Sequence, residues 1–415
     1  MRVTQVGLWT TFTLAMLTVS PCLQAQQDPG PRRGADAGDR LPGLSKEQKD
    51  LFDLGREEFT GSEGIGDGLG PRFNLNSCGG CHAHPAVGGT APAVNPQVDL
   101  ATAGGAHNKV PKFITRNGPI REVRSTIDGQ VHALYVISGR RDDTGDARKC
   151  PIRQQDFSDT TNLRFRITTP VFGAGLIEQI PDAEIRANRG NKSSDKQRLG
   201  IRGALQRQGN SGNCLGRFGW KAQHANLENF AGEAYNVEMG ITSELSPGER
   251  DTTPECQYAL VPNSLPPEDG GPGDVELFAA FMRGLAGPTP SQNTPGGARS
   301  IARGKAAFSA VGCALCHTPT LAGVPLYSDL LLHSMGNTLA DGIQQGSAGP
   351  DQFRTAPLWG LGQRLFFLHD GRTTDLMETI GAHKSAGSEA NQVINNFDEI
   401  SVQDKQDLLN FLRSL

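Results

Sequence analysis

The sequence predicts a mainly α-helical protein of two similar modules, the first of which contains a large insertion of mixed structure. Three repeated features support this fold class. The pentad C-x-x-C-H occurs at 78–82 and again at 313–317. A Gly-x-x-x-Phe step precedes each pentad, and a Phe-x-Arg-x-Leu segment follows each one, at 281–285 and 411–415. Motifs that return in the same order indicate an internal repeat.

The composition limits the class of protein. A chain of 415 residues is long enough for two or three domains. With 40 Lys and Arg against 44 Asp and Glu, the net charge is −4, which gives no reason to expect nucleic acid as a partner. Residues 1–25 carry an apolar stretch and end in a small residue, which predicts a cleaved secretory signal. We expect an exported, periplasmic protein without a membrane span in the mature chain.

The first module is expected over residues 45–285, after a polar Pro/Gly linker at 26–44. Its first helix is predicted in SKEQKDLFDLGREEFTG, where Ser45 can cap the helix with Gln48 three residues on. Leu51, Gly55 and Phe59 fall on one face of this helix.

The second module is expected over residues 301–415, after a linker at 286–300. SIARGKAAF, before the second pentad, repeats the Gly-x-x-x-Phe step with Gly304 and Phe308. The exit helices DVELFAAFMRGL and KQDLLNFLRSL align with each other, and Ser401 with Asp404 can cap the second.

The first module must hold about a hundred extra residues, at about 100–250, because its exit segment lies much farther from its pentad. The runs 131–137 and 163–167 alternate as strands and predict a β-hairpin with a long loop. Residues 224–240 predict a helix with Leu227, Phe230, Ala234 and Val237 on one face, ending at Gly240.

The spacing within each pentad suits covalent haem attachment. Two thiols three positions apart can each form a thioether to a porphyrin, while the following His binds the iron. A zinc site would need a second pair of ligands, and a redox dithiol expects a strand and then a helix, whereas Gly and Pro surround these pentads. The residues predicted to bind two haem c groups are Cys78, Cys81 and His82, and Cys313, Cys316 and His317.

Three cysteines remain after export, namely Cys150, Cys214 and Cys256. In an oxidising compartment we expect one disulfide and one buried thiol. The sequence does not decide which pair bridges.

Six further sequence motifs, together with the two pentads, resemble those of a known protein family. CHAHPAVGG, PKFITRNGPIREVR, PVFGAGLIEQIPDAEI, GRFGWKAQ, EMGITSEL and RTAPLWGLGQRLFFLHDGRTTDLMETIGAH follow one another in this order. With the two pentads, they resemble the bacterial di-haem oxidoreductase, putative peroxidase family over nearly the whole chain after the linker. The C-terminal half is more distantly similar to di-haem cytochrome c peroxidases, to the enzyme that matures methylamine dehydrogenase and to rubber oxygenases. The resemblance implies two cytochrome c-type haem domains and leaves the substrate open.

The resemblance also implies a ligand for the C-terminal haem. In di-haem peroxidases the residue fourteen positions after the His of the HDG stretch binds this iron, usually as Met. Fourteen residues after His369 this chain has His383, so we expect a bis-His haem through His317 and His383. Such a haem should have a lower potential than a His/Met haem. Met335 and Met377 are rival ligands, and His369 is expected to order a turn.

The chemistry is expected at the N-terminal haem, where peroxide cleavage needs an open iron position and a nearby proton-transferring group. The resemblance favours Glu178 in this role, and His107 is a candidate displaceable ligand. Trp220 or Trp359 is expected to assist electron transfer between the haems. A calcium ion, known among the relatives, has no residues assigned here.

The predicted function is that of an exported oxidoreductase with peroxidase-like activity. Electrons would pass from the bis-His haem to a peroxide-reactive N-terminal haem, with a cytochrome or cupredoxin as redox partner. The alternatives are a di-haem electron carrier without catalysis and a haem dioxygenase of the rubber-oxygenase type.

Overall fold

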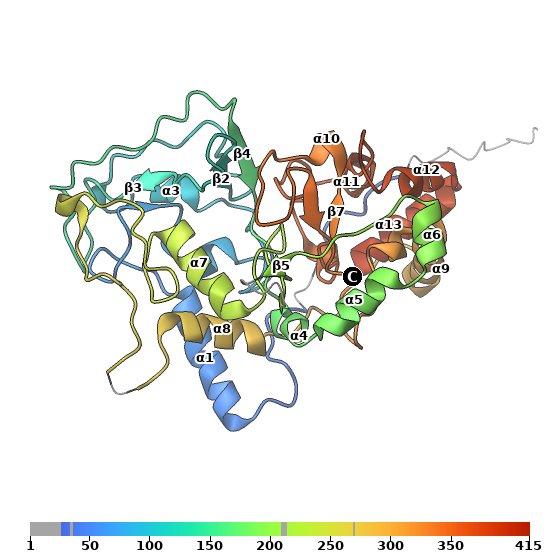
Figure 1. Ribbon diagram of the computed structural model, residues 1–415, viewed down its shortest axis with the longest axis horizontal. Helices are drawn as coiled ribbons and strands as arrows, with labels where there is room; N and C mark the ends of the chain where they lie inside the picture. Colours follow the sequence, from blue (N-terminus) through green and yellow to red (C-terminus); the bar gives the residue numbers. More distant parts are fainter. Residues whose placement is uncertain (1–25, 34–35, 209–213, 269) are drawn as a thin grey trace, which may run out of the picture.

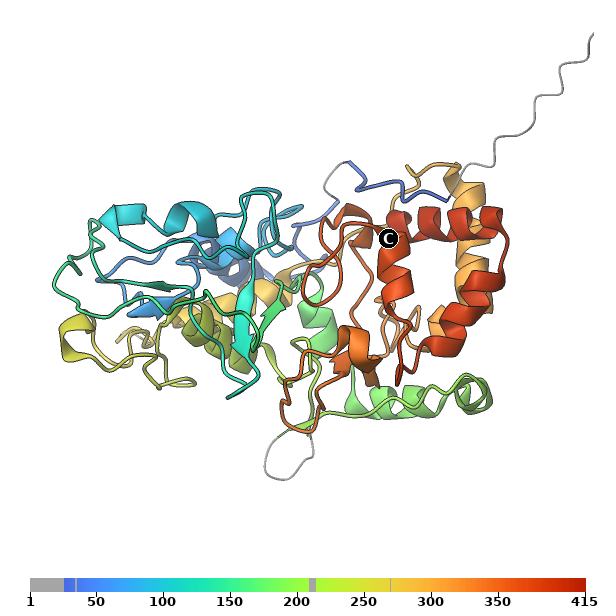
Figure 2. The ribbon, with the colours of Figure 1, turned by 90° about the horizontal axis from the view of Figure 1, so that it is seen from above.

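The structure is a computed structural model that describes residues 26–33, 36–208, 214–268 and 270–415. The protein is mainly helical with a few short strands, as the sequence predicts. Figures 1 and 2 show the elements around the first pentad on one side of the molecule and those around the second on the other. The expected signal peptide, residues 1–25, lies outside the described residues. Within the described ranges, no helix combines the length and the apolar character that a bilayer span requires.

The α-helices range from 4 to 15 residues in length (Figure 1). The α-helices are α1 (Lys46–Thr60), α2 (Cys78–Cys81), α3 (Gln97–Leu100), α4 (Ala174–Glu178), α5 (Asp182–Gly190), α6 (Ser193–Arg198), α7 (Leu227–Met239), α8 (Asp274–Gly284), α9 (Gly297–Val311), α10 (Gly336–Leu339), α11 (Leu376–Ala382), α12 (Asn391–Glu399) and α13 (Val402–Ser414). The 3-10 turns are η1 (Ala103–Gly105), η2 (Pro254–Cys256), η3 (Cys313–Leu315) and η4 (Leu361–Gln363).

The strands form two-stranded antiparallel sheets, β1 with β3, β2 with β4, β5 with β6 and β7 with β8. Their bounds are β1 (Arg72–Phe73), β2 (Glu122–Ser125), β3 (Tyr135–Val136), β4 (Leu163–Arg166), β5 (Arg207–Gln208), β6 (Cys214–Leu215), β7 (Leu332–Ser334) and β8 (Gln352–Arg354). Most of the core is therefore built by helices and loops.

Two equivalent helix pairs confirm the internal repeat. Gly55 of α1 lies against the backbone of α8, because a Cβ atom at this glycine would be 2.2 Å from the carbonyl oxygen of Leu277. Gly304 of α9 meets α13 in the same way, with its ideal Cβ position 1.9 Å from the carbonyl oxygen of Asp407. Glycine is required at such contacts because any side chain would push the helices apart. The glycine of each Gly-x-x-x-Phe step is thus the contact point of its helix pair.

The phenylalanines of the repeat pack equivalently. The ring centroids of Phe59 and Phe281 are 4.8 Å apart, and those of Phe308 and Phe411 are 5.4 Å apart. All four side chains are buried. In each module the helix before the pentad is therefore joined to the exit helix by a glycine contact and an aromatic pair.

The cap of α1 is confirmed. The Ser45 side chain accepts from the Gln48 backbone N–H, and the Gln48 side chain accepts from the Ser45 N–H. Gly55 and Phe59 lie on the buried face as predicted, whereas Phe52 rather than Leu51 completes it.

The helix predicted at 224–240 is α7, which ends at Gly240 with φ 72°. Its buried face runs through Leu227, Ala231, Tyr235 and Met239. Leu227 was predicted on this face, while the other predicted positions are only half-buried. A periodic set of apolar residues does not fix the rotation of a helix when other large side chains, here Tyr235 and Met239, lie on a neighbouring face.

The predicted hairpin between 131–137 and 163–167 is wrong. β4 pairs with β2, and β3 pairs with β1, so the two predicted strands belong to different sheets. The side chain of Asn108 bonds both the N–H and the carbonyl of Val136, which occupies the groups that a longer ladder would use. Strand pairing depends on such tertiary partners as well as on the local pattern.

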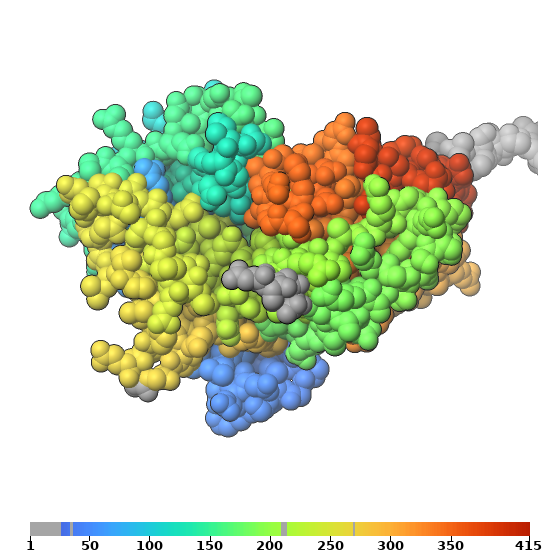
Figure 3. Space-filling view, in the orientation of Figure 1, coloured from blue at the N-terminus to red at the C-terminus, as the bar shows by residue number. Residues whose placement is uncertain are grey.

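Part of the insertion packs on the C-terminal module. Leu199 and Ile201, after α6, share a buried cluster with Leu315 and Val393. Figures 1 and 2 show the green segment with α5 and α6 along the edge of the orange and red C-terminal part, and the space-filling view shows it on the surface next to that part (Figure 3). Part of the segment predicted as an insertion therefore contacts the region of the second pentad.

The segment predicted as an N-terminal linker is bonded to both modules. Asp28 forms a buried ion pair with Arg413 at 2.6 Å, and the backbone N–H of Leu41 donates to the carbonyl of Gly284. The segment before α1 is therefore fixed to both modules and is not a free linker.

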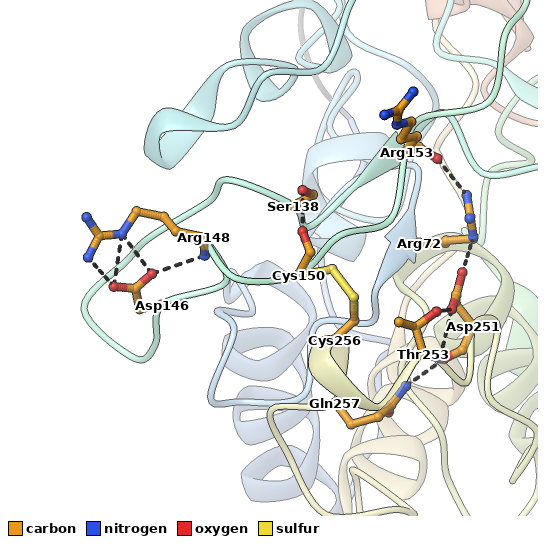
Figure 4. The surroundings of a disulfide bond; sticks show 10 residues. All are labelled: Arg72, Ser138, Asp146, Arg148, Cys150, Arg153, Asp251, Thr253, Cys256 and Gln257. Carbon is orange, nitrogen blue, oxygen red and sulfur yellow. Dashed lines mark hydrogen bonds and ion pairs between the residues drawn. A yellow bond between two sulfur atoms is a disulfide. The ribbon is translucent and has the colours of Figure 1, made fainter.

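A disulfide joins Cys150 to Cys256 (Figure 4). It confirms that one pair of the three remaining cysteines bridges. The expectation of a buried third thiol is wrong, because Cys214 begins the short strand β6 and is exposed. The two-residue strand lies on the surface, so the side chain of its first residue has no core to pack into.

Candidate haem sites

The first pentad forms a short helix with its histidine at the end. Cys78 and Cys81 bound α2, and His82 is its C-terminal cap residue. The Nδ1 of His82 lies 3.0 Å from the carbonyl oxygen of Gly89, which can only accept. Nδ1 therefore carries the proton, and Nε2 keeps the lone pair that a metal needs. Burial lowers the pKa of His82 to about 4, which keeps the ring neutral at pH 7.

The second pentad repeats this arrangement. Cys313 opens η3, and the Nδ1 of His317 lies 3.1 Å from the carbonyl oxygen of Tyr327. Burial, with the nearby His383 as a further cause, lowers the pKa of His317 to about 4. Phe59 and Phe308 lie 5.5 Å and 6.4 Å from their respective histidine rings. Both histidines are thus fixed in the tautomer of an iron ligand.

A cavity of about 210 Å³ opens beside the second pentad. Cys313, Cys316 and His317 line one part of it, and His383 lines it as well. His383 follows α11, and its Nδ1 lies 2.8 Å from the carbonyl oxygen of Thr379. Its Nε2 is therefore also the nitrogen with a free lone pair, and burial lowers the pKa of this ring.

The two methionines that rival His383 differ in position. Met335 lines the same cavity, whereas Met377 packs beside the buried core between α9 and α13. Besides His317, the cavity therefore offers the imidazole of His383 and the thioether of Met335 as rival ligands, and His333 and His369 also line it.

Two buried arginines in this cavity are suitable partners for the carboxylates of a haem. Arg354 and Arg364 both line it, and burial lowers the pKa of each to about 10. Arg354 donates through Nε to the carbonyl of Gly219, but its buried Nη1 has no partner among the described residues. A haem carries two propionate carboxylates, which are the groups that a guanidinium binds best. A largely apolar cavity with a thiol pair, the imidazoles of His317 and His383 and two buried arginines fits a haem.

His369 is a buried residue of the same cavity. Its ring stacks on Phe353 with centroids 4.4 Å apart and lies 6.3 Å from the ring of Trp220. Burial lowers its pKa to about 4. The backbone carbonyl of His369 accepts from the N–H of Ile167 in the insertion.

Both candidate tryptophans lie where the modules meet. Trp359 comes from the C-terminal module but packs into the large N-terminal core, against Gly173 and Gly287. Trp220 donates from Nε1 to the carbonyl of Ile167 at 2.8 Å and lines the cavity of His383. A smaller cavity of about 30 Å³ has both tryptophans, Arg354 and Arg364 on its wall.

Glu178 is held by structural partners. Its carboxylate accepts from Nε of Arg283 at 2.7 Å and from the backbone N–H of Leu227, the first residue of α7, at 2.8 Å. His107 is exposed in a surface loop beside Gly139. In the part of the chain that the structure describes, neither residue has a recorded contact with His82.

A buried acid near the first pentad was missed in the sequence. Glu238 precedes Met239, whose sulfur lies 4.0 Å from that of Cys78. The Glu238 carboxylate accepts from the Asn74 amide at 2.8 Å and is hydrogen-bonded to Glu122. Burial and the charge of Glu122 raise the pKa of Glu238 to about 8. The sequence feature that could have identified it is an acidic residue at the C-terminal end of an apolar helix. This residue is the first of the EMGITSEL motif.

A second missed cluster surrounds Cys316. His333 lies between two carboxylates, with Nδ1 2.8 Å from Glu389 and Nε2 3.0 Å from Asp329. Cys316, Asp329 and His333 are close enough to hold a metal ion. Since Cys316 is assigned to thioether formation, we interpret the cluster as the anchor of the loop around the second pentad. Glu389 also accepts from the backbone N–H of Arg202, which fixes the insertion to this loop.

Comparison with known proteins gives the following relatives. A family model described as di-haem oxidoreductase, putative peroxidase matches residues 127–415. The search of curated proteins found no significant match.

Several solved structures are similar at low identity. Hydrazine synthase of Kuenenia stuttgartiensis is 12% identical with a TM-score of 0.40, covering 98% of this chain and 100% of that one. A MauG-like protein associated with microbial copper homeostasis is 14% identical with a TM-score of 0.39, covering 94% and 93%. The diheme peroxidase BthA of Burkholderia thailandensis E264 is 14% identical with a TM-score of 0.34, covering 94% and 91%.

Proposed function

The chain belongs to the di-haem oxidoreductase, putative peroxidase family, and from this premise we propose that it is an exported enzyme that reduces peroxide with two covalently attached haems. The observation that carries this proposal is the second imidazole in the cavity of one of two equivalent histidines. His82 and His317 make the same Nδ1 bond to a backbone carbonyl, while His317 shares its cavity with the imidazole of His383. Unequal iron ligation gives the two haems different roles.

His317 and His383 would hold the C-terminal iron between two nitrogen ligands. A six-coordinate bis-His iron has no open position, so it suits the transfer of electrons and not the binding of peroxide. His82 would hold the N-terminal iron. When bound, the haems supply the redox chemistry, in which peroxide takes up electrons and protons and is reduced to water.

The protons have a candidate source in the chain. Glu238 is buried beside the like charge of Glu122, which disfavours a second negative charge there. The pKa of Glu238, raised to about 8, places a proton on the acid pair at neutral pH. Glu178, which the family resemblance favours, would need to leave Arg283 before its carboxyl could transfer a proton. His107 would need its loop to move if it were to bind the N-terminal iron.

Electrons would pass between the haems through the region where the two modules are in contact. Trp359 reaches from the C-terminal module into the N-terminal core, which makes it the better placed of the two tryptophans. A cytochrome or a cupredoxin would supply the electrons to the C-terminal haem. The Cys150–Cys256 disulfide supports a periplasmic location, because such bonds persist in oxidising compartments.

A spectroscopic titration tests this function. The holoprotein in its ferric state should give one low-spin bis-His signal and one signal that changes when hydrogen peroxide is added. Peroxide consumption should then depend on a reduced cytochrome donor. Two low-spin haems that do not respond to peroxide would contradict the enzyme and support a carrier, and oxygen-dependent cleavage of an organic substrate would support a dioxygenase.

A further inference from the structure

A buried tyrosine lies near the first pentad, and its hydroxyl is within hydrogen-bond distance of two carboxylates. Tyr235 is in α7, one helical turn before Met239, whose sulfur lies 4.0 Å from that of Cys78. The side chain is 2% exposed. Its hydroxyl donates to Glu63 Oε1 at 3.1 Å and lies 3.3 Å from Asp274 Oδ2.

The carboxylate of Glu63 has a high affinity for a proton. Burial is the largest cause that raises its pKa; the Tyr235 hydrogen bond lowers it and the charges of Glu58, Asp274 and Asp67 raise it, and the net result is a pKa of about 7. A phenol that loses an electron becomes a strong acid and releases its proton to the group it is bonded to. Glu63 is placed to receive it within an existing hydrogen bond.

Aromatic rings connect Tyr235 to the first iron ligand. The ring of Tyr235 lies 5.0 Å from that of Phe278, which lies 6.2 Å from Phe59. Phe59 lies 5.5 Å from the imidazole of His82. Tyr235 is thus close to the N-terminal haem site both through this series of rings and through the Met239 contact with Cys78.

We propose that Tyr235 is a redox-active residue that donates one electron to the N-terminal haem centre after peroxide has oxidised it, while its hydroxyl proton passes to Glu63. This inference rests on the proposed function, which supplies peroxide as the oxidant. The tyrosine O–H bond breaks, an O–H bond forms on Glu63, and a neutral tyrosyl radical remains as one oxidising equivalent at the centre is reduced. No new charge is created in the core. Oxidation alone would leave a positive charge on the phenol, but the proton carries this charge to Glu63 and neutralises its carboxylate.

A second buried tyrosine provides the matched control. Tyr135 lies in the same core, fully buried, and its hydroxyl donates at 2.6 Å to the backbone carbonyl of Gln97. A backbone carbonyl accepts a hydrogen bond but does not take up a proton at neutral pH. Tyr135 therefore has the burial of Tyr235 without the carboxylate partner.

The experiment is freeze-quench EPR on the full-length ferric holoprotein after one equivalent of hydrogen peroxide. We expect a tyrosyl radical whose signal narrows when the protein carries ring-deuterated tyrosine. The signal should persist in Tyr135→Phe and be lost in Tyr235→Phe. It should also be lost in the double variant Glu63→Gln with Asp274→Asn, which keeps Tyr235 and an acceptor for its hydroxyl but removes the proton acceptors. Pyridine haemochrome spectra confirm the haem content of each variant.

The outcomes separate this inference from the function on which it rests. A haem spectrum that responds to peroxide without a tyrosyl signal would overturn the role of Tyr235 and leave the peroxidase intact. A tyrosyl signal that persists in Tyr235→Phe would assign the radical elsewhere. A haem spectrum that peroxide does not change would contradict the proposed function and, with it, this inference.

Discussion

His317 and His383 line one cavity, and each ring has its Nδ1 within hydrogen-bond distance of a backbone carbonyl. The carbonyl partners leave the Nε2 atoms as the two nitrogens able to bind iron. This relationship is the basis on which we propose a bis-His C-terminal haem of low potential.

The variant His383→Met should raise the midpoint potential of the C-terminal haem, because a thioether ligand favours ferrous iron. We expect an increase of about 0.1 V or more, within the range of about 0.8 V that axial ligands cover. A spectroelectrochemical titration measures it. His132→Met is the control, since His132 is bonded to Asp128 and Gln155 in the insertion. An unchanged potential in His383→Met would remove His383 as the ligand.

The variant Arg354→Gln should lower the potential of the same haem. Reduction adds negative charge, which the buried guanidinium in this cavity would stabilise, so its removal should favour the ferric state. The same titration measures the effect, with Arg198→Gln as an exposed control on α6. A potential equal to that of the unaltered protein would mean that Arg354 does not contact the propionates.

The variant Gly304→Ala should destabilise the C-terminal module. Its new Cβ would overlap the carbonyl oxygen of Asp407, and overpacking of this kind costs about 1–3 kcal/mol or more. Gly381→Ala is the matched control, because this glycine in α11 has open space where a Cβ would lie. That control should gain about 0.5–1 kcal/mol from better helix propensity. Thermal unfolding compares the two, and equal effects would contradict the close helix contact.

The stability of Glu238→Gln should depend less on pH than that of the unaltered protein. The folded-state pKa of Glu238 is raised to about 8 from 4.5, so the folded state binds more protons than the unfolded state between these values. The contribution of this group is therefore fully present below about pH 4.5 and is lost as pH rises through about 8. The advantage of the variant over the unaltered protein should grow from pH 5 to pH 8 in thermal unfolding. The exposed Glu57→Gln on α1 is the control, and parallel curves for Glu238→Gln would argue against a buried acid pair.

The repeat was the part of the fold that the sequence predicted best. The Gly-x-x-x-Phe steps, the exit segments and the cap at Ser45 all lie in local patterns whose meaning does not depend on distant residues. Both pentads were recognised for the same reason, since their spacing is local, whereas His383 was predicted from the family resemblance through its offset from His369.

The parts that were missed depend on tertiary partners. The pairing of β4 with β2 rather than with β3 could not be predicted, because Asn108 and other distant side chains decide where each short strand ends. Arg354 stood in a quoted motif, but its importance lies in a buried nitrogen without a partner, which only the folded chain reveals. Tyr235 and Glu63 are far apart in the sequence and meet only through the packing of α7.

The central claim is that one chain carries two haems through thioether bonds at its two pentads. Intact mass spectrometry of the denatured mature protein tests it most directly, together with digestion to locate each attachment. We predict a mass increase of two haem groups, one on the peptide with Cys78 and Cys81 and one on the peptide with Cys313 and Cys316. A denatured chain without haem mass, or with haem on only one of these peptides, would contradict the account.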